Sequence, residues 1–117
     1  MNTNGYSVGE HFENRKPVVK DIYKAIIRTA KKFGPVKEDP KKTSIHLVRK
    51  TAFAGIATRK SGLILTLKSD SNVVNTRIAR REQASAHRWH LEIKLDAPEQ
   101  VDQEIAAWLE QAYQIAG

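Results

Sequence analysis

The chain has 117 residues, of which 40% are hydrophobic, a formal net charge of +7, and no cysteine. This length suits one domain, and the lack of cysteine excludes disulfides, thiolate metal sites and cysteine nucleophiles. No run of about 18 apolar residues could span a membrane, and the polar start has no secretory apolar stretch. We therefore expect a cytoplasmic protein without a membrane partner, with a flexible N-terminal arm over residues 1–10 and a single domain over residues 11–117.

The charges are sorted along the chain. All twenty Lys and Arg residues lie between Arg15 and Lys94, where only six carboxylates oppose them. No basic residue follows Lys94, whereas five carboxylates do. A basic body beside an acidic end creates a directional field that attracts anions over about 8 Å at physiological salt.

The first predicted element is a helix over residues 17–33. Pro17 suits the first helical turn, the apolar residues that follow recur at helical spacing, and Gly34–Pro35 ends the helix. Residues 35–42 are predicted to form a loop, because Pro35 and Pro40 restrict the backbone and the charges alternate in sign.

Four strands are predicted next, over residues 43–49, 52–58, 63–68 and 87–95, because apolar and polar residues alternate there. The turn Arg59–Gly62 carries a hairpin signal. Residues 73–86 are ambiguous, and we favour an irregular arm while keeping a short helix open.

The last predicted element is a helix that begins at Asp96, with Asp96 as its cap and Glu99 reaching back. Consecutive short strands with tight turns imply an antiparallel sheet, and each amphipathic helix needs a sheet face on which to bury its stripe. The expected fold is α+β, a two-layer sandwich with an antiparallel four-stranded sheet and both helices on one face, in the order α-β-β-β-β-α.

Several short features, taken in order, resemble the small bacterial domain of unknown function family numbered 5655. They are His11–Phe12, Tyr23, Gly34–Pro35, Lys42–Thr43, Phe53, Trp108 and Ala112–Tyr113. The resemblance covers nearly the whole chain from His11 onward. It implies the same α+β fold and small cytoplasmic proteins or attached modules, and it implies no activity.

The residues give little support for catalysis or metal binding. His87 and His90 would point to opposite faces of a strand, so they cannot share a metal there, and His46 with His90 would form an incomplete site. No nucleophile elbow, activated carboxylate pair or phosphate-binding glycine motif is present. We expect no metal, no cofactor and no enzymatic activity.

A run of arginines is the leading site candidate. Four of the eight arginines fall within twelve residues, and guanidinium groups bind phosphate or carboxylate oxygens bidentately. We predict a binding site for an anionic partner, most of all nucleic acid held by its phosphates. Its residues are Arg77, Arg80, Arg81 and Arg88, with Lys68 and His90. Most of the few aromatic residues are expected in the core, so few remain to stack on bases.

The alternative is a protein-interaction or homodimerisation module on the open sheet face. Val48, Ile56 and Ile64 are expected there beside His46, and apolar residues on an uncovered face suggest a partner. Cover by residues 73–86 would explain the same pattern, and we weigh these two explanations equally.

Overall fold

The computed structural model describes residues 5–117. Its two α-helices are α1 (Pro17–Lys31) and α2 (Gln103–Ile115), and its two 3₁₀ turns are η1 (Gly9–Phe12) and η2 (Pro98–Gln100). The six strands are β1 (Lys37–Pro40), β2 (Ile45–Val48), β3 (Ala52–Thr58), β4 (Leu63–Ser69), β5 (Ile78–Ser85) and β6 (Arg88–Leu95).

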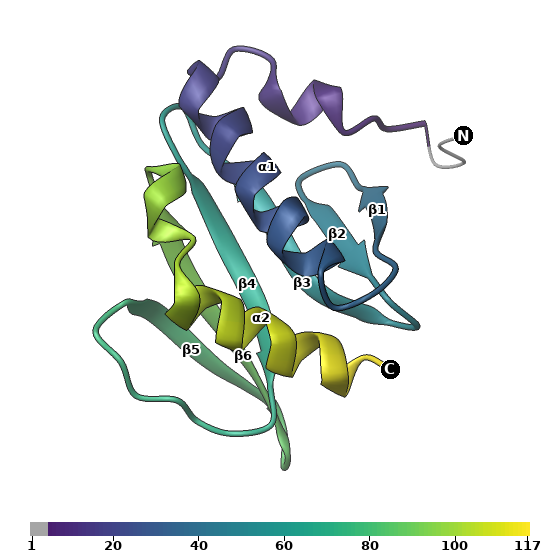
Figure 1. Ribbon diagram of the computed structural model, residues 1–117, viewed down its shortest axis with the longest axis vertical. Coiled ribbons are helices and arrows are strands. Elements are labelled where there is room, and N and C mark those ends of the chain that lie inside the picture. The colour runs from purple at the N-terminus through teal and green to yellow at the C-terminus, as the bar shows by residue number, and fades with distance from the viewer. Residues whose placement is uncertain (1–4) are drawn as a thin grey trace.

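All six strands form one antiparallel sheet in the order β1-β2-β3-β4-β6-β5. Both helices lie on the same side of this sheet, α1 over its β1 half and α2 across β3, β4 and β6 (Figure 1). The α+β class, the two helices and the antiparallel sheet are confirmed. The predicted number of four strands is wrong, because the sheet also contains β1 and β5.

The first helix forms much as its sequence predicts. Pro17 occupies its first turn, where a missing N–H has no acceptor to lose. The stripe that includes Ile22 and Ile26 is fully buried against the sheet. After the helix, Gly34 has φ +146°, in a region that residues with a side chain rarely adopt.

Strand β1 replaces part of the predicted loop over residues 35–42. Lys37 pairs with Val48 and Pro40 with Ile45, which places Pro40 in the edge strand of the sheet. Proline is tolerated at an edge, where its missing N–H breaks no ladder. The alternating charges that suggested a loop belong to a strand with one exposed side.

Strand β5 replaces most of the predicted irregular arm over residues 73–86. It pairs with β6 along its length, and bulges between Ile78 and Arg80 and between Gln83 and Ser85 interrupt the register. Every residue after Ile78 in this strand is exposed. The strand therefore has no alternation of apolar and polar residues, because backbone pairing rather than core burial holds it.

The second helix begins later than predicted. Asp96 does not cap it; instead, the side chain of Gln100 accepts hydrogen bonds from the backbone N–H groups of Asp96 and Ala97, at 2.7 and 3.1 Å. Asp102 is the helix cap and accepts from the N–H of Ile105 at 3.2 Å. The polar stretch thus contains a separate 3₁₀ turn before α2.

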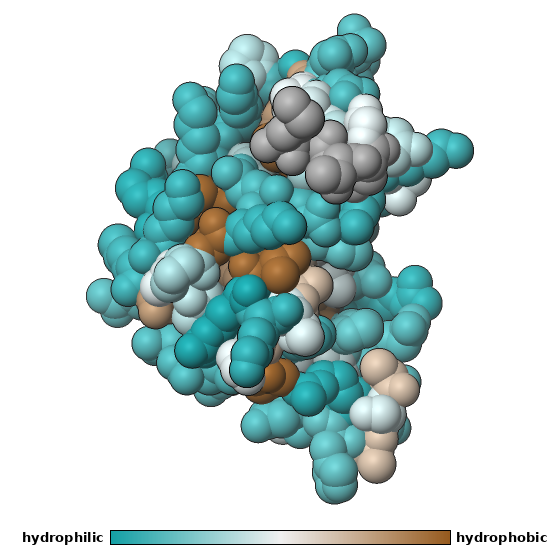
Figure 2. All heavy atoms as spheres, turned by 90° about the vertical axis from the view of Figure 1, so that its right-hand side faces the viewer, coloured by the Kyte–Doolittle hydropathy of each residue, from teal (hydrophilic) through white to brown (hydrophobic). Residues whose placement is uncertain are grey.

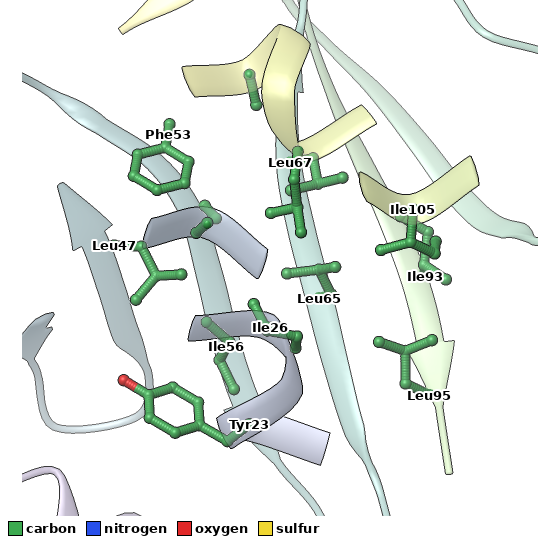
Figure 3. Packing of buried hydrophobic residues seen from close by; sticks show 14 of the residues in the cluster. Tyr23, Ile26, Leu47, Phe53, Ile56, Leu65, Leu67, Ile93, Leu95 and Ile105 are labelled. Carbon is green, nitrogen blue, oxygen red and sulfur yellow. The ribbon is translucent and has the colours of Figure 1, made fainter. Parts of the chain in front are cut away.

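The core fills the space between the sheet and the two helices (Figure 3). Ile56 lies within it, at 0% exposure, so the prediction that Ile56 belongs to the open face is wrong. The reason is a register irregularity between Leu47 and Val48 opposite Ala52. Phe53 and Ala54 are consecutive and both buried, and from Ala54 onward the even-numbered side chains of β3 face the helices.

Candidate anion-binding face of the sheet

The side of the sheet that faces away from the helices, here called the outer face, carries a groove of about 320 Å³. Polar side chains on its wall come from β2, β4 and β6: His46, Thr66, Lys68 and His90. Small residues such as Ser44, Gly55 and Ala57 form much of the rest of the lining, together with Phe53 and Leu67.

Gly55 explains why the surface is hollow. His46 and Thr66 are its cross-strand partners, and a Cβ at this position would lie 3.9 Å from the His46 ring and 4.0 Å from Thr66. A side chain here would therefore fill the groove at ordinary contact distance. The sequence carries one signal for this groove, since a glycine inside a strand is a known sign of close backbone approach.

Lys68 and His90 face each other across β4 and β6 at one side of the groove. The Lys68 ammonium donates a hydrogen bond to the Thr51 hydroxyl at 3.3 Å. Partial burial first, and the nearby charge of Arg88 second, lower the pKa of Lys68 below its usual value. Among residues 5–117 the ion pairs are Lys41–Asp39, Arg77–Asp102, Arg77–Glu104 and Arg80–Glu82, so neither Lys68 nor Arg88 is neutralised.

The other arginines do not gather at this groove. Arg80 is paired across the sheet with Glu92 of β6 and forms an exposed ion pair with Glu82 at 3.1 Å. Arg81 pairs with the buried Leu91 and so points to the opposite side, where its guanidinium donates to the Val73 carbonyl oxygen at 3.4 Å.

Arg77 lies at the start of the β5 segment and is bound to the acidic end of the chain. Its guanidinium contacts Asp102 at 2.9 Å and Glu104 at 3.1 Å, and it donates to the Gln100 carbonyl oxygen at 2.6 Å. These carboxylates raise the pKa of Arg77. In turn, the Arg77 guanidinium first, and the backbone N–H of Ile105 second, lower the pKa of Asp102. Arg77 therefore joins β5 to α2, and its role in binding stays a prediction.

The two histidines of the groove come from strands that are not neighbours, since β3 and β4 lie between β2 and β6. Within the described part of the chain, no three His, Asp or Glu residues are grouped as a metal site would require. Of the predicted interaction face, Val48 and Ile64 are half-buried and alternate with core residues of their strands, so they lie on the outer face as expected.

Over residues 5–117 the structure defines a two-layer α+β domain. The sheet face opposite the helices carries a groove, and beside it Lys68 and Arg88 form no ion pair with a described residue. The chain belongs to the family described as Domain of unknown function (DUF5655), whose sequence profile matches residues 8–116. The resemblance drawn from the sequence is thus confirmed. No curated protein and no solved structure matches the chain, and no helix over residues 5–117 has the length and apolar character to cross a membrane.

Proposed function

We propose that the protein is a non-catalytic binding domain for an anionic partner, and that the phosphates of a nucleic acid are the anion it takes. The observation that carries this proposal is the pair of neighbouring cations on the outer face. Lys68 and Arg88 repel each other beside the groove, and the pKa of Lys68 is lowered partly for that reason. An anion placed between them offsets this repulsion and favours the charged form of the lysine.

Further charged and titratable groups along the outer face lie where they can contact the same anion. His90 stands across from Lys68. Arg80 lies on the next strand outward, where a phosphate would have to replace Glu82 in its exposed ion pair. A phosphate backbone repeats its charge along its length, so it can use several such cations at once. Because these contacts read no base edges, we expect little sequence preference.

The experiment is a titration of random single-stranded and double-stranded oligonucleotides at several salt concentrations. With two or three phosphate contacts, we expect the logarithm of affinity to fall with log[salt] at a slope of roughly −2. The double variant Lys68→Gln/Arg88→Gln should lose most binding and reduce the slope. The control Lys16→Gln/Lys32→Gln removes two exposed cations of the α1 segment and should change affinity much less. Equal losses in both variants would reject the outer face as the site.

A second candidate function is a protein-interaction or homodimerisation module on the same face. Val48 and Ile64 favour it, because they are half-buried apolar residues on a surface without a covering layer. The burial of Ile56 removes the central residue of the predicted apolar patch, so this candidate ranks second. A dimer in light scattering, together with no oligonucleotide binding at low salt, would favour it over the first.

A further inference from the structure

A second groove lies on the helix side of the molecule, between η1 and α1. Its volume is about 560 Å³, within the range of about 300–1,000 Å³ that small-molecule sites occupy. Its lining residues come from the segment before α1, from α1 itself and from β1.

The floor of this groove is apolar. The rings of Phe12 and Tyr23 are in contact, with centroids 5.2 Å apart. Val8, Phe12 and Ile27 are partly buried and pack against the core, so each also has an exposed part. Figure 2, which views the edge of the sheet at β1, shows hydrophobic atoms gathered within a mostly hydrophilic surface. Exposed apolar surface of this kind gains free energy when an apolar ligand covers it.

The wall formed by η1 is held in place by hydrogen bonds. Ser7 and Glu10 exchange two of them, from the Ser7 N–H to the Glu10 carboxylate at 2.8 Å and from the Glu10 N–H to the Ser7 hydroxyl at 3.2 Å. The buried Thr58 hydroxyl donates to the His11 carbonyl oxygen at 2.6 Å, and the His11 ring lies 2.8 Å from the Lys41 carbonyl oxygen. The groove is therefore preformed, which lowers the entropic cost of binding.

The rim of the groove is cationic. Lys20, Lys24, Arg28 and Lys31 recur at helical spacing along one side of α1, and all four are exposed. None of them takes part in an ion pair with the residues that the structure describes. Among the described residues that line the groove, Glu38 is the one carboxylate, and it accepts a hydrogen bond from the Tyr23 hydroxyl at 2.6 Å. The Glu38 carboxylate therefore faces the Tyr23 hydroxyl inside the protein as well as the cations of the rim.

We propose that this groove binds a single amphipathic anion, a molecule with an alkyl chain and a carboxylate head like that of a fatty acid. The alkyl chain lies on Phe12 and Ile27, and the carboxylate meets Lys24 and Arg28. The charge complementarity of the rim selects an anion, and the apolar floor excludes a purely polar one. The amino-acid sequence alone does not reveal this groove, because nothing in it shows that η1 folds against α1 to form the second wall.

The test is isothermal titration of the full chain with dodecanoate, kept below its micelle concentration. Saturable binding to one site is expected. The charge reversal Lys24→Glu/Arg28→Glu should weaken it about tenfold, because two exposed attractive charges are replaced by two repulsive ones. The matched control Lys16→Glu/Lys32→Glu makes the same charge change near α1 outside the groove and should keep affinity within about twofold. No saturable binding, or an equal loss in both variants, would overturn the proposal.

Three further measurements test the apolar floor, the independence of the groove from the outer face, and a lipid surface as the alternative ligand. Ile27→Gln tests the apolar floor and should also weaken dodecanoate binding, with circular dichroism confirming that the variant remains folded. Lys68→Gln/Arg88→Gln should bind dodecanoate as the unaltered protein does. This variant therefore tests the proposal for the groove independently of the proposal for the outer face. Co-sedimentation with phosphatidylglycerol vesicles distinguishes a lipid surface, and vesicle binding without dodecanoate binding would contradict a site for a single molecule.

Discussion

The Tyr113 hydroxyl donates a hydrogen bond to the Pro35 carbonyl oxygen at 2.9 Å, which fastens the end of α2 to the turn after α1. The same ring packs edge-on against Phe53 with centroids 5.2 Å apart. Arg49 lies over it at 4.4 Å and donates to the Tyr113 carbonyl oxygen at 3.0 Å. One aromatic residue thus joins both helices and the β2–β3 turn.

This arrangement makes Gly34 intolerant of a side chain. Its φ of +146° disfavours any other residue, and an added Cβ would overlap the Tyr113 hydroxyl. We expect Gly34→Ala to lower the free energy of unfolding by about 1–3 kcal/mol, measured by urea denaturation. Gly9→Ala is the control, because a Cβ at Gly9 meets no atom within 4 Å. A similar loss in both variants would contradict this explanation.

Tyr23→Phe should destabilise the protein by about 1 kcal/mol at neutral pH. The substitution removes the donor that binds the partly buried Glu38 and keeps the ring that packs on Phe12. Thermal unfolding followed by circular dichroism measures the effect. An unchanged melting temperature would mean that water replaces the tyrosine hydroxyl without cost.

The same tyrosine should make the fold sensitive to alkali. Burial first, and the Glu38 hydrogen bond and charge second, raise the pKa of Tyr23 well above its usual value of about 10. A pKa raised by folding contributes stability below the unfolded pKa, and this stability is lost as pH rises from about 10 toward the raised value. Stability of the unaltered protein should therefore fall more steeply above pH 10 than that of Tyr23→Phe. Parallel slopes would contradict the assignment.

Arg77→Gln should lower the free energy of unfolding by about 1–2 kcal/mol, because it removes the contacts that join β5 to the start of α2. The variant should bind oligonucleotides nearly as well as the unaltered protein, in contrast to Lys68→Gln/Arg88→Gln. Urea denaturation and the salt titration supply both measurements. Weak binding by folded Arg77→Gln would instead support the arginine site predicted from the sequence.

Asp102 should contribute to loss of stability in acid. The Arg77 contact first, and the Ile105 N–H second, lower the pKa of this carboxyl below its usual value of about 4. A lowered pKa gives stability that is present above the unfolded value and lost as pH falls through the folded value. Asp102→Ala should cost about 1 kcal/mol at pH 7 through the lost cap. The difference from the unaltered protein should shrink below about pH 4, as unfolding curves at both pH values can show.

The elements that bury a regular stripe could be predicted from the sequence. The helix over 17–33, the strand over 52–58 and the strand over 87–95 all appear close to their expected bounds, because burial imposes a period on each of them. Strands β1 and β5 could not be predicted in this way. Both lie at sheet edges, where pairing with a neighbouring strand, rather than a buried face, determines the structure.

The candidate site was predictable in part for the same reason. Lys68, Arg88 and His90 share the outer face because they alternate with core residues on two regular strands. The separation of Arg80 from Arg81 and the ion pairs of Arg77 depend on β5, and no buried stripe marks this strand in the sequence. The groove at Gly55 and the wall formed by η1 depend on tertiary contacts that no local pattern contains.

In strand β5 only the Ile78 side chain is partly buried, and the strand pairs with β6 at the edge of the sheet. Its amide hydrogens should exchange with solvent sooner than those of β4, since detaching it exposes little apolar surface. If β5 detached briefly, β6 would lose its hydrogen-bonding partner on that side, and Arg77 would separate from the carboxylates of Asp102 and Glu104. We therefore expect this edge of the sheet to open and close locally while the core stays buried.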